Sequence, residues 1–322
     1  MSSVVNIAIH ASQSPENVRR DLLESLRTRR VNHKFHYDSI KQTNKWLALH
    51  QVHSPSRNDR DCAATYNRAF ASAAKAIASK AVHLVGLGCG GGQKDTRLLK
   101  LLKAKGRTIS YTPSDVSVAM TLIAQQAARA VLPSEKIFPL VCDLATADDL
   151  PEVLVTRHSS LVTFFGMIPN FEPDHILPKL AKLIRPQDTL LFSANLAPGD
   201  DYAVGVKKIL PQYDNELMRD WLMTFLLNLG VERSDGAVRF TAENGRLGLK
   251  RVVARYHFRR ARQIEAEGKL FNFKSGDVVQ LFFSYRYTPE LVCTKLAMHG
   301  LKVQEQWITK SGEEGVFFCR LK

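Results

Sequence analysis

Residues 81–204 alternate short apolar runs with stretches of helical spacing, and this alternation constrains the fold of the 322-residue chain more than any other feature. Each apolar run ends in turn residues, as buried strands do. Strands are predicted at 82–85, 108–111, 137–141, 161–165 and 189–194, and helices at 96–105, 116–130 and 175–184. Five strands that alternate with helices predict an α/β fold with a doubly wound, Rossmann-like parallel sheet that binds ligands at the carboxyl ends of its strands.

The segments on either side of this block follow other patterns. Residues 1–80 are predicted to be helical, with one helix beginning at Pro15 and an alanine-rich helix over 63–81. A further helix is expected at 215–228. The C-terminal residues predict a strand at 278–287, a helix at 289–298 and a closing strand hairpin within 301–321.

Basic residues are concentrated outside the alternating block. Residues 1–80 carry 13 basic and 6 acidic side chains, residues 81–204 carry 12 of each, and residues 205–280 carry 14 and 9. The basic segment 247–262 fits a helix or a strand. A helix would align Arg251, Arg255, Arg259 and Arg262 on one face, and a strand would align Arg255, His257 and Arg259. This charge allows a nucleic-acid partner, but a solvated basic surface is favoured, since no RNA- or DNA-binding motif accompanies it.

Other compositional features exclude several classes of protein. No apolar run approaches the roughly 18 residues that span a bilayer, and the first residues do not form a signal peptide, so we expect a cytoplasmic protein with no membrane partner. The five cysteines lack metal-ligand spacing and are predicted to be free thiols. No metal site is expected.

A glycine cluster follows the first predicted strand, at 86–92. Glycines at Gly88 and Gly90 let the backbone turn sharply and let a bulky cofactor approach, although a tight turn alone also needs glycine. Asp115 ends the second strand and is placed to bind a ribose diol, its alternative role being a helix cap. Asp143 follows the third strand. This second acid favours S-adenosylmethionine over NAD or FAD.

Several longer motifs resemble those of the histidine-specific Nα-methyltransferase family, which includes the ergothioneine-pathway enzyme and the ergot dimethylallyltryptophan N-methyltransferase. The resemblance runs from about Tyr37 to the C-terminus. Its motifs are Tyr37-Asp38, Pro55-Ser56-Arg57, the glycine loop with residues 94–99, residues 111–117, Thr163-Phe164-Phe165-Gly166 with Asn170-Phe171, residues 190–195, Gln212-Tyr213-Asp214 and residues 284–290.

The resemblance implies a methyltransferase sheet domain and a second, α+β substrate domain. The expected division is 1–80 for the N-terminal part of the substrate domain, 81–204 for the S-adenosylmethionine-binding core, 205–280 for an insertion completing the substrate domain, and 281–322 for the terminal strands of the core sheet. The implied cofactor residues are Tyr37, Gly88, Gly90, Lys94, Asp115, Asp143 and Leu144. The implied acceptor residues are Gly166, Asn170, Tyr213 and Ser284, and Phe282 is predicted to bind the substrate at a position where the family carries another residue.

Asn170 and Tyr213 are the implied catalytic residues. The Asn170 amide oxygen can accept a hydrogen bond from an amine while the nitrogen lone pair stays free to attack the methyl group, whereas its alternative role is a helix cap. The Tyr213 hydroxyl can assist deprotonation of the amine or hold a carboxylate.

The chain departs from the family pattern at four places. Gly86 stands where most methyltransferases of this sheet type carry an acid, and the loop is one residue longer than usual. Ser54 replaces a tyrosine used on the substrate carboxylate, and Phe282 replaces the glutamate that reads the imidazole of histidine. An aromatic wall favours an aromatic or hydrophobic amine instead.

The sequence therefore predicts an S-adenosylmethionine-dependent N-methyltransferase for a small amine or amino-acid-like substrate. Two alternatives remain at this stage. The basic segments suit methylation of RNA or an acidic protein, and Gly86 with its longer loop suits a non-catalytic relative that binds the cofactor.

Overall fold

The computed structural model describes residues 4–54, 58–154 and 158–322. The predicted turn motif at residues 55–57 lies outside the described residues. The chain divides into two compact units, which alternate along the sequence. Unit 1 comprises residues 1–13, 55–196 and 287–322, and unit 2 comprises residues 14–54 and 197–286.

Unit 1 contains an eight-stranded sheet in the order β1-β4-β3-β2-β5-β6-β13-β12. The strands are β1 (Ala8–Ile9), β2 (Ala81–Leu87), β3 (Thr108–Asp115), β4 (Leu140–Val141), β5 (Ser159–Phe164), β6 (Thr189–Asn195), β12 (Leu301–Ile308) and β13 (Glu314–Leu321). Neighbouring strands from β1 to β6 are parallel, and β13 runs antiparallel to β6 and β12. The strand order reverses between β2 and β5, which is where doubly wound sheets bind ligands.

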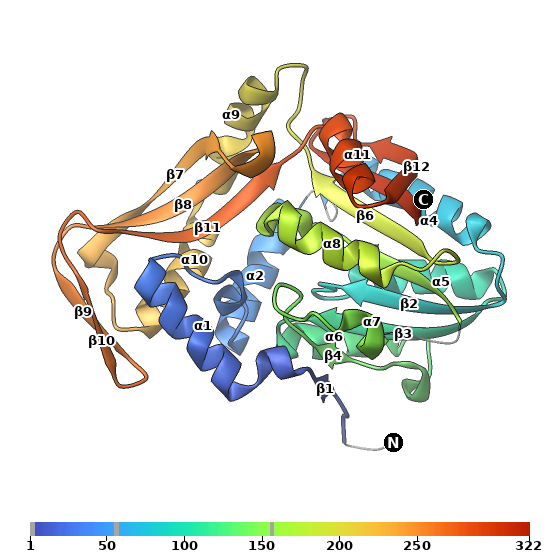
Figure 1. Cartoon of the computed structure of the whole chain (residues 1–322), viewed down its shortest axis with the longest axis horizontal. Coiled ribbons are helices and arrows are strands. Elements are labelled where there is room, and N and C mark those ends of the chain that lie inside the picture. The colour runs from blue at the N-terminus through green and yellow to red at the C-terminus, as the bar shows by residue number, and fades with distance from the viewer. Residues whose placement is uncertain (1–3, 55–57, 155–157) are drawn as a thin grey trace. The chain divides into compact units, whose positions relative to one another are not determined.

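Helices cover both faces of this sheet (Figure 1). One face carries α4 (Arg60–Ala76), α5 (Gln93–Ala104) and α6 (Val118–Ala128), and the other carries α7 (Leu150–Leu154), α8 (Pro173–Leu183) and α11 (Pro289–Met298). Helix α5 is amphipathic, and its apolar side buries Leu98, Leu99 and Leu102 against the sheet core. The predicted doubly wound sheet with a C-terminal hairpin is confirmed.

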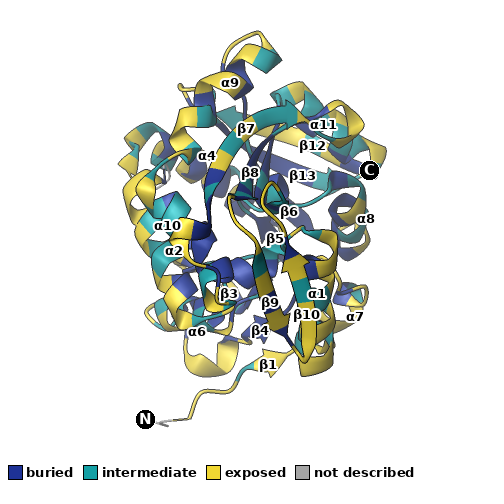
Figure 2. Ribbon diagram, turned by 90° about the vertical axis from the view of Figure 1, so that its left-hand side faces the viewer, coloured by how far each residue is buried: buried dark blue, intermediate teal, exposed yellow. Residues whose placement is uncertain are grey.

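Unit 2 is an α+β body built around a three-stranded antiparallel sheet in the order β11-β8-β7. Its strands are β7 (Gly236–Asn244), β8 (Lys250–Phe258) and β11 (Val278–Arg286), with a separate hairpin of β9 (Arg262–Ala266) and β10 (Lys269–Phe273). Its helices are α1 (Pro15–Thr28), α2 (Ile40–His53), α9 (Tyr202–Tyr213) and α10 (Glu216–Asn228). The core gathers Trp221, Phe225 and Tyr256, whereas much of the β9–β10 hairpin is exposed (Figure 2).

The structure decides one open alternative and corrects one prediction. The basic segment 247–262 is strand and not helix over Lys250–Phe258, because Val252, Val253 and Ala254 are buried in the middle of the small sheet while Arg255 and His257 are less buried. Residues 281–322 are predicted to form the terminal strands of the core sheet. The first strand of this segment, β11, instead pairs with β8 in unit 2.

The unit boundaries also differ from the predicted ones. The alanine-rich helix α4 packs on β12, β13 and β6, so that it belongs to unit 1 and not to the N-terminal part of a substrate domain. Strand β1 likewise joins unit 1 through parallel pairing with β4.

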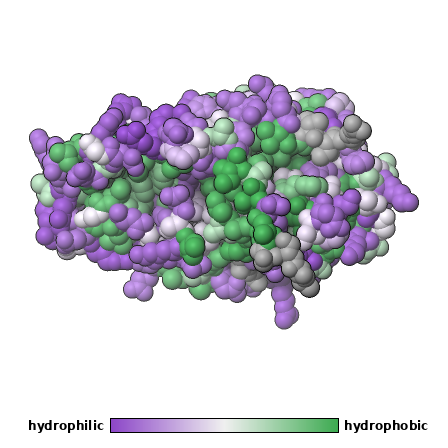
Figure 3. Space-filling model, turned by 90° about the horizontal axis from the view of Figure 1, so that it is seen from below, coloured by the Kyte–Doolittle hydropathy of each residue, from purple (hydrophilic) through white to green (hydrophobic). Residues whose placement is uncertain are grey.

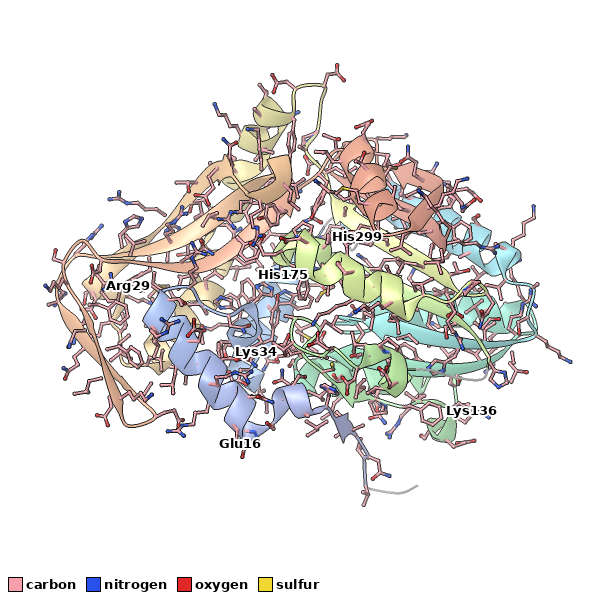
Figure 4. All side chains as sticks on the ribbon, in the orientation of Figure 1. Glu16, Arg29, Lys34, Lys136, His175 and His299 are labelled. Atoms are coloured by element: carbon pink, nitrogen blue, oxygen red, sulfur yellow. The ribbon has the colours of Figure 1, made fainter. Side chains whose placement is uncertain are left out.

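Many basic side chains of unit 2 form ion pairs within the unit. Glu243 binds Arg251 and Arg255, with nitrogen–oxygen distances of 2.9 and 2.6 Å. The buried Lys34 ammonium lies 2.7 Å from Asp21, and Arg29 lies 2.9 Å from Asp277 (Figure 4). Pairing of this kind reduces the number of cations that remain for an external polyanion.

No helix among the described residues is both long and apolar enough to cross a membrane. Hydrophilic residues are spread over the face drawn in Figure 3, with patches of hydrophobic residues among them. Within the described parts of the chain, no group of three or more His, Cys, Asp or Glu side chains could hold a metal ion.

Candidate functional site

The glycine loop leads from β2 into α5 at the point where the strand order reverses. Gly88, Gly90 and Gly92 have φ angles of 63°, 52° and 71°, a region that favours glycine. A Cβ on Gly88 would lie 2.3 Å from the Met167 sulfur, and a Cβ on Gly92 would lie 2.8 Å from the Cα of Ala124 in α6. Glycine is therefore required both for the turn and for the close approach of neighbouring segments.

Asp115 connects the end of β3 to this loop. Its carboxylate accepts hydrogen bonds from the backbone N–H of Gly90 at 2.9 Å and of Ser117 at 3.0 Å. The N-cap of α6 is Ser117, whose hydroxyl accepts from Met120 N–H, so Asp115 itself is not that cap. Burial raises the pKa of Asp115 to about 6, although the two backbone donors oppose this rise. Each carboxylate oxygen can accept a second hydrogen bond, as a ribose diol requires.

Asp143 and Leu144 follow β4, the strand next to β3. Both residues are buried, and Asp143 Oδ1 accepts a hydrogen bond from Ala145 N–H at 2.9 Å. The backbone N–H of Asp143 donates to Ser12 Oγ at 3.0 Å. Because β3 and β4 are parallel, Asp115 and Asp143 lie at the same edge of the sheet.

Lys94 lies in the first turn of α5 and is held by an aromatic hydroxyl. Its ammonium donates to Tyr66 Oη at 2.7 Å and lies 3.6 Å from the Glu314 carboxylate. Tyr66 Oη is 2.9 Å from Ser193 Oγ, which in turn accepts the Gly166 N–H at 2.9 Å. This chain of contacts links the beginning of α5 to the loop after β5.

Gly166 and Asn170 belong to that loop. Gly166 has a φ angle of 68° with open space around its Cα, so that glycine is needed there for the turn itself. Asn170 ends the short helix Ile168–Asn170 and donates its N–H to Met167 O at 3.0 Å. The N-cap position of α8 is Glu172, two residues after Asn170.

In unit 2, Tyr213, Ser284 and Arg286 form a polar group at the end of α9 and on β11. The Tyr213 hydroxyl lies 2.8 Å from Ser284 Oγ and accepts a hydrogen bond from Arg286 at 2.6 Å. The Arg286 guanidinium also lies over the Tyr213 ring, 5.3 Å from its centroid. Two predicted acceptor residues are therefore in contact with each other and with a buried cation.

An aromatic cluster surrounds Phe282 in the same unit. Its ring centroid lies 5.7 Å from that of His33, 6.0 Å from Trp221 and 6.2 Å from Tyr213. Burial, reinforced by nearby His36, lowers the pKa of His33 to about 3, so this imidazole is neutral at ordinary pH. Phe282 thus lies in apolar and aromatic surroundings within the buried core of unit 2.

Tyr37 belongs to unit 2, where its hydroxyl lies 3.1 Å from His33 Nε2 and its ring packs 5.4 Å from that of Trp221. Its predicted contact with the cofactor stays a prediction. Ser54 is buried and is the C-cap of α2, its N–H donating to His50 O at 3.0 Å.

The structure adds residues that sequence reasoning did not single out. In unit 1 these are Asp95, Tyr66 and Ser193, and in unit 2 His33 and Arg286. Two sequence features, the extra loop residue and the glycine at position 86, could have drawn attention to Asp95. Tyr66, Ser193, His33 and Arg286 have no such feature in their local sequence.

The residues of unit 1 fit an adenosyl cofactor such as S-adenosylmethionine. The loop brings backbone rather than side chains to the end of β2, and the Gly88 position leaves no room for a Cβ beside Met167. Asp115 adds a buried acceptor at the adjoining strand end. These residues would hold the cofactor.

Comparison with known proteins gives a family and several similar folds. A family model described as "Histidine-specific methyltransferase, SAM-dependent" matches residues 18–321. No curated protein matches the chain. Similar solved structures include the CcbJ methyltransferase from Streptomyces caelestis, with 12% identity over 80% of this chain and 94% of that chain and a TM-score of 0.42. The mitomycin 7-O-methyltransferase MmcR has 14% identity over 97% and 70%, with a TM-score of 0.44, and OxaC has 13% over 79% and 46%, with a TM-score of 0.43.

Proposed function

The chain belongs to the histidine-specific, S-adenosylmethionine-dependent methyltransferase family, with a Rossmann-like class I fold, and we propose that it methylates the nitrogen of a small aromatic or hydrophobic amine rather than that of histidine. The observation that carries this proposal is the aromatic cluster around Phe282. The amine can be amino-acid-like, because Arg286 supplies positive charge beside Tyr213 and Ser284.

Phe282 argues against histidine on energetic grounds. A glutamate at this position accepts a charge-assisted hydrogen bond from an imidazole N–H, and its loss in a buried site costs about 1.5–3 kcal/mol. Phe282 is only 7% exposed and contacts the rings of Trp221 and His33. Aromatic surroundings of this kind instead favour binding of a ligand that buries apolar area and stacks on the aromatic rings.

The chain's own residues need only bind and orient the reactants, without activating the methyl group. When bound, S-adenosylmethionine supplies an already activated methyl group. In our proposal Asn170 of unit 1 accepts a hydrogen bond from the neutral amine and orients its lone pair. For unit 2 we propose Tyr213 and Ser284 as acceptor residues, as the family resemblance implies. Asp115 and the glycine loop hold the adenosyl part of the cofactor.

The ion pairs of unit 2 weigh against an RNA substrate. Arg251 and Arg255 share Glu243, and Arg262 lies 2.6 Å from Asp235. Several cations of the basic segment are therefore already neutralised within the unit.

The test is a panel of methyl acceptors assayed with radiolabelled S-adenosylmethionine, containing histidine, tryptophan, tryptamine and phenylethylamine. We expect the aromatic compounds to be methylated and histidine to react poorly. The variant Phe282→Glu should shift the ratio of kcat/KM values toward histidine by about tenfold, less than the full value of one charge-assisted bond because Ser54 is unchanged.

Phe283→Glu is the matched control, since the neighbouring ring packs on Tyr285 and lies near the Arg251 guanidinium instead of joining the cluster. Methylation of histidine by the wild-type protein at about 10⁴ M⁻¹s⁻¹ or more would overturn the proposal. So would activity confined to RNA or protein acceptors.

A further inference from the structure

Gly86, near the end of β2, lies directly beneath a carboxylate that comes from another element. A Cβ built on Gly86 would be only 2.1 Å from Asp95 Oδ2 and 3.1 Å from its Cγ. No side chain fits at position 86 while Asp95 keeps this conformation. The place where most methyltransferases of this sheet type carry an acid is thus filled by the acid of Asp95, which reaches it from the first turn of α5.

Two hydroxyls fix the Asp95 carboxylate in this place. Tyr111 of β3 donates to Oδ2 at 2.8 Å, and Thr163 of β5 donates to Oδ1 at 2.9 Å. Strands β3 and β5 are the two neighbours of β2, so Asp95 is tied to both sides of the strand that carries Gly86. The carboxylate therefore stands at the reversal of strand order, where this fold binds its ligand.

Burying the ionised Asp95 carboxylate costs free energy unless a cation lies beside it. The residue is 3% exposed, and burial raises its pKa to about 6, against the effect of Tyr111, Thr163 and Lys94. Above that pH the side chain is an anion with two neutral donors, and each oxygen retains a further acceptor position. A cation bound beside the loop would offset the cost of this burial.

We infer that Asp95 takes over the role of the missing acid at position 86 and binds the α-ammonium group of S-adenosylmethionine. The lost acid and the lengthened loop are then two parts of one change, in which the carboxylate moved from β2 to α5 while keeping its place at the sheet edge. The inference rests on the family's cofactor and is independent of the proposed acceptor.

The experiment compares two ligands that share adenosine and sulfur. S-adenosylhomocysteine carries the amino and carboxyl groups of the cofactor, and 5′-methylthioadenosine lacks both. In titration calorimetry at pH 8, Asp95→Asn should weaken binding of S-adenosylhomocysteine by about 10- to 100-fold, the value of one charge-assisted hydrogen bond. Binding of 5′-methylthioadenosine should change less than twofold, while Asp115→Asn should weaken both ligands.

A second variant returns the acid to the strand. Gly86→Asp combined with Asp95→Ala should bind S-adenosylhomocysteine at least fivefold more tightly than Asp95→Ala alone, with 5′-methylthioadenosine binding as the check of an intact loop. Equal weakening of both ligands by Asp95→Asn would show a purely structural role and overturn the inference. So would unchanged S-adenosylhomocysteine affinity, or a double variant that binds 5′-methylthioadenosine but gains nothing over Asp95→Ala. Because no methyl acceptor is present, failure here is distinguishable from an error in the proposed substrate.

Discussion

The parallel sheet of unit 1 and the small antiparallel sheet of unit 2 present their site residues in different ways. In unit 1 the residues lie at or just after successive strand ends, at Gly88, Asp115, Asp143 and Gly166, and the hydrogen bonds of the last three involve backbone N–H groups. In unit 2 the residues Tyr213, Ser284 and Phe282 contact one another through side chains.

This difference separates what the fold determines from what single substitutions can change. A carboxylate that accepts from Gly90 N–H requires the strand, the loop and their register, so cofactor binding is tied to topology. The ring of Phe282 is carried by β11 next to a register shift between Gln280 and Phe282, and it packs among side chains of unit 2. We therefore expect a substitution at Phe282 to change acceptor choice more than cofactor binding.

The largest effect is expected from Asp115→Ala. Asp115 is proposed to bind both ribose hydroxyls. Without its carboxylate these two hydrogen bonds cannot form and the Gly90 N–H loses its partner, so the affinity for S-adenosylhomocysteine should fall by about 2–4 kcal/mol. Titration calorimetry measures this loss. Ser284→Ala, in unit 2, is the matched variant and should leave cofactor affinity unchanged. If the two variants weaken the cofactor equally, the contrast between the units fails.

A smaller effect on a different quantity is expected from Asn170→Ala. Turnover of the true substrate should fall about 10- to 100-fold, or about 1.4–2.7 kcal/mol, because the amine is no longer oriented. The affinity for S-adenosylhomocysteine should stay within twofold. Glu172→Gln, at the N-cap of α8, is the neighbouring control in steady-state kinetics. Full activity of Asn170→Ala would show that Asn170 does not bind the acceptor.

The sequence predicted unit 1 well because its signals are local. Hydrophobic runs that end in glycine or aspartate identify β2 and β3, and the helix Pro289–Met298 with the strand Leu301–Ile308 matches the predicted bounds. Asp115 was placed correctly at a strand end. Its bond to Gly90 was not predicted, since that contact depends on how the loop folds back.

Unit 2 was harder to predict because its strands lack a clear strand pattern in the sequence. In β7, charged Arg239 and Glu243 interrupt the apolar residues, and β8 fits helical and strand spacing alike. The contact of His33 with Phe282 joins residues about 250 positions apart and leaves no trace in either local sequence. Asp95 had a signal in the longer loop, but only the structure shows its carboxylate against Gly86.

The smallest expected effect is on the free energy of unfolding at acidic pH, and it again compares unit 1 with unit 2. Burial lowers the pKa of His36 in unit 2 to about 4. In unit 1, burial lowers the pKa of His83 to about 4 as well but raises the pKa of Asp95 and Asp115 to about 6. Below the unfolded pKa of about 6.5, the unfolded chain protonates His36 and the folded chain does not, so this contribution to stability falls as the pH falls from 6.5 to 4. The two buried carboxyl groups act oppositely, because between about pH 6 and 4 the folded chain binds more protons at them than the unfolded chain does.

Substitution of His36 by glutamine separates the two contributions. Glutamine keeps an N–H donor for Leu281 O, which the His36 ring contacts at 2.6 Å, but it has no titrating group. Between pH 7.5 and 5.5 the wild-type free energy of unfolding should fall by about 1 kcal/mol more than that of His36→Gln, measured by urea unfolding. The fluorescence of Trp221, whose ring lies 5.2 Å from His36, reports on unit 2. His299→Gln in unit 1, at a half-exposed residue (Figure 4), is the control. Equal pH slopes for wild type and His36→Gln would show that His36 does not contribute to the acid response of unit 2.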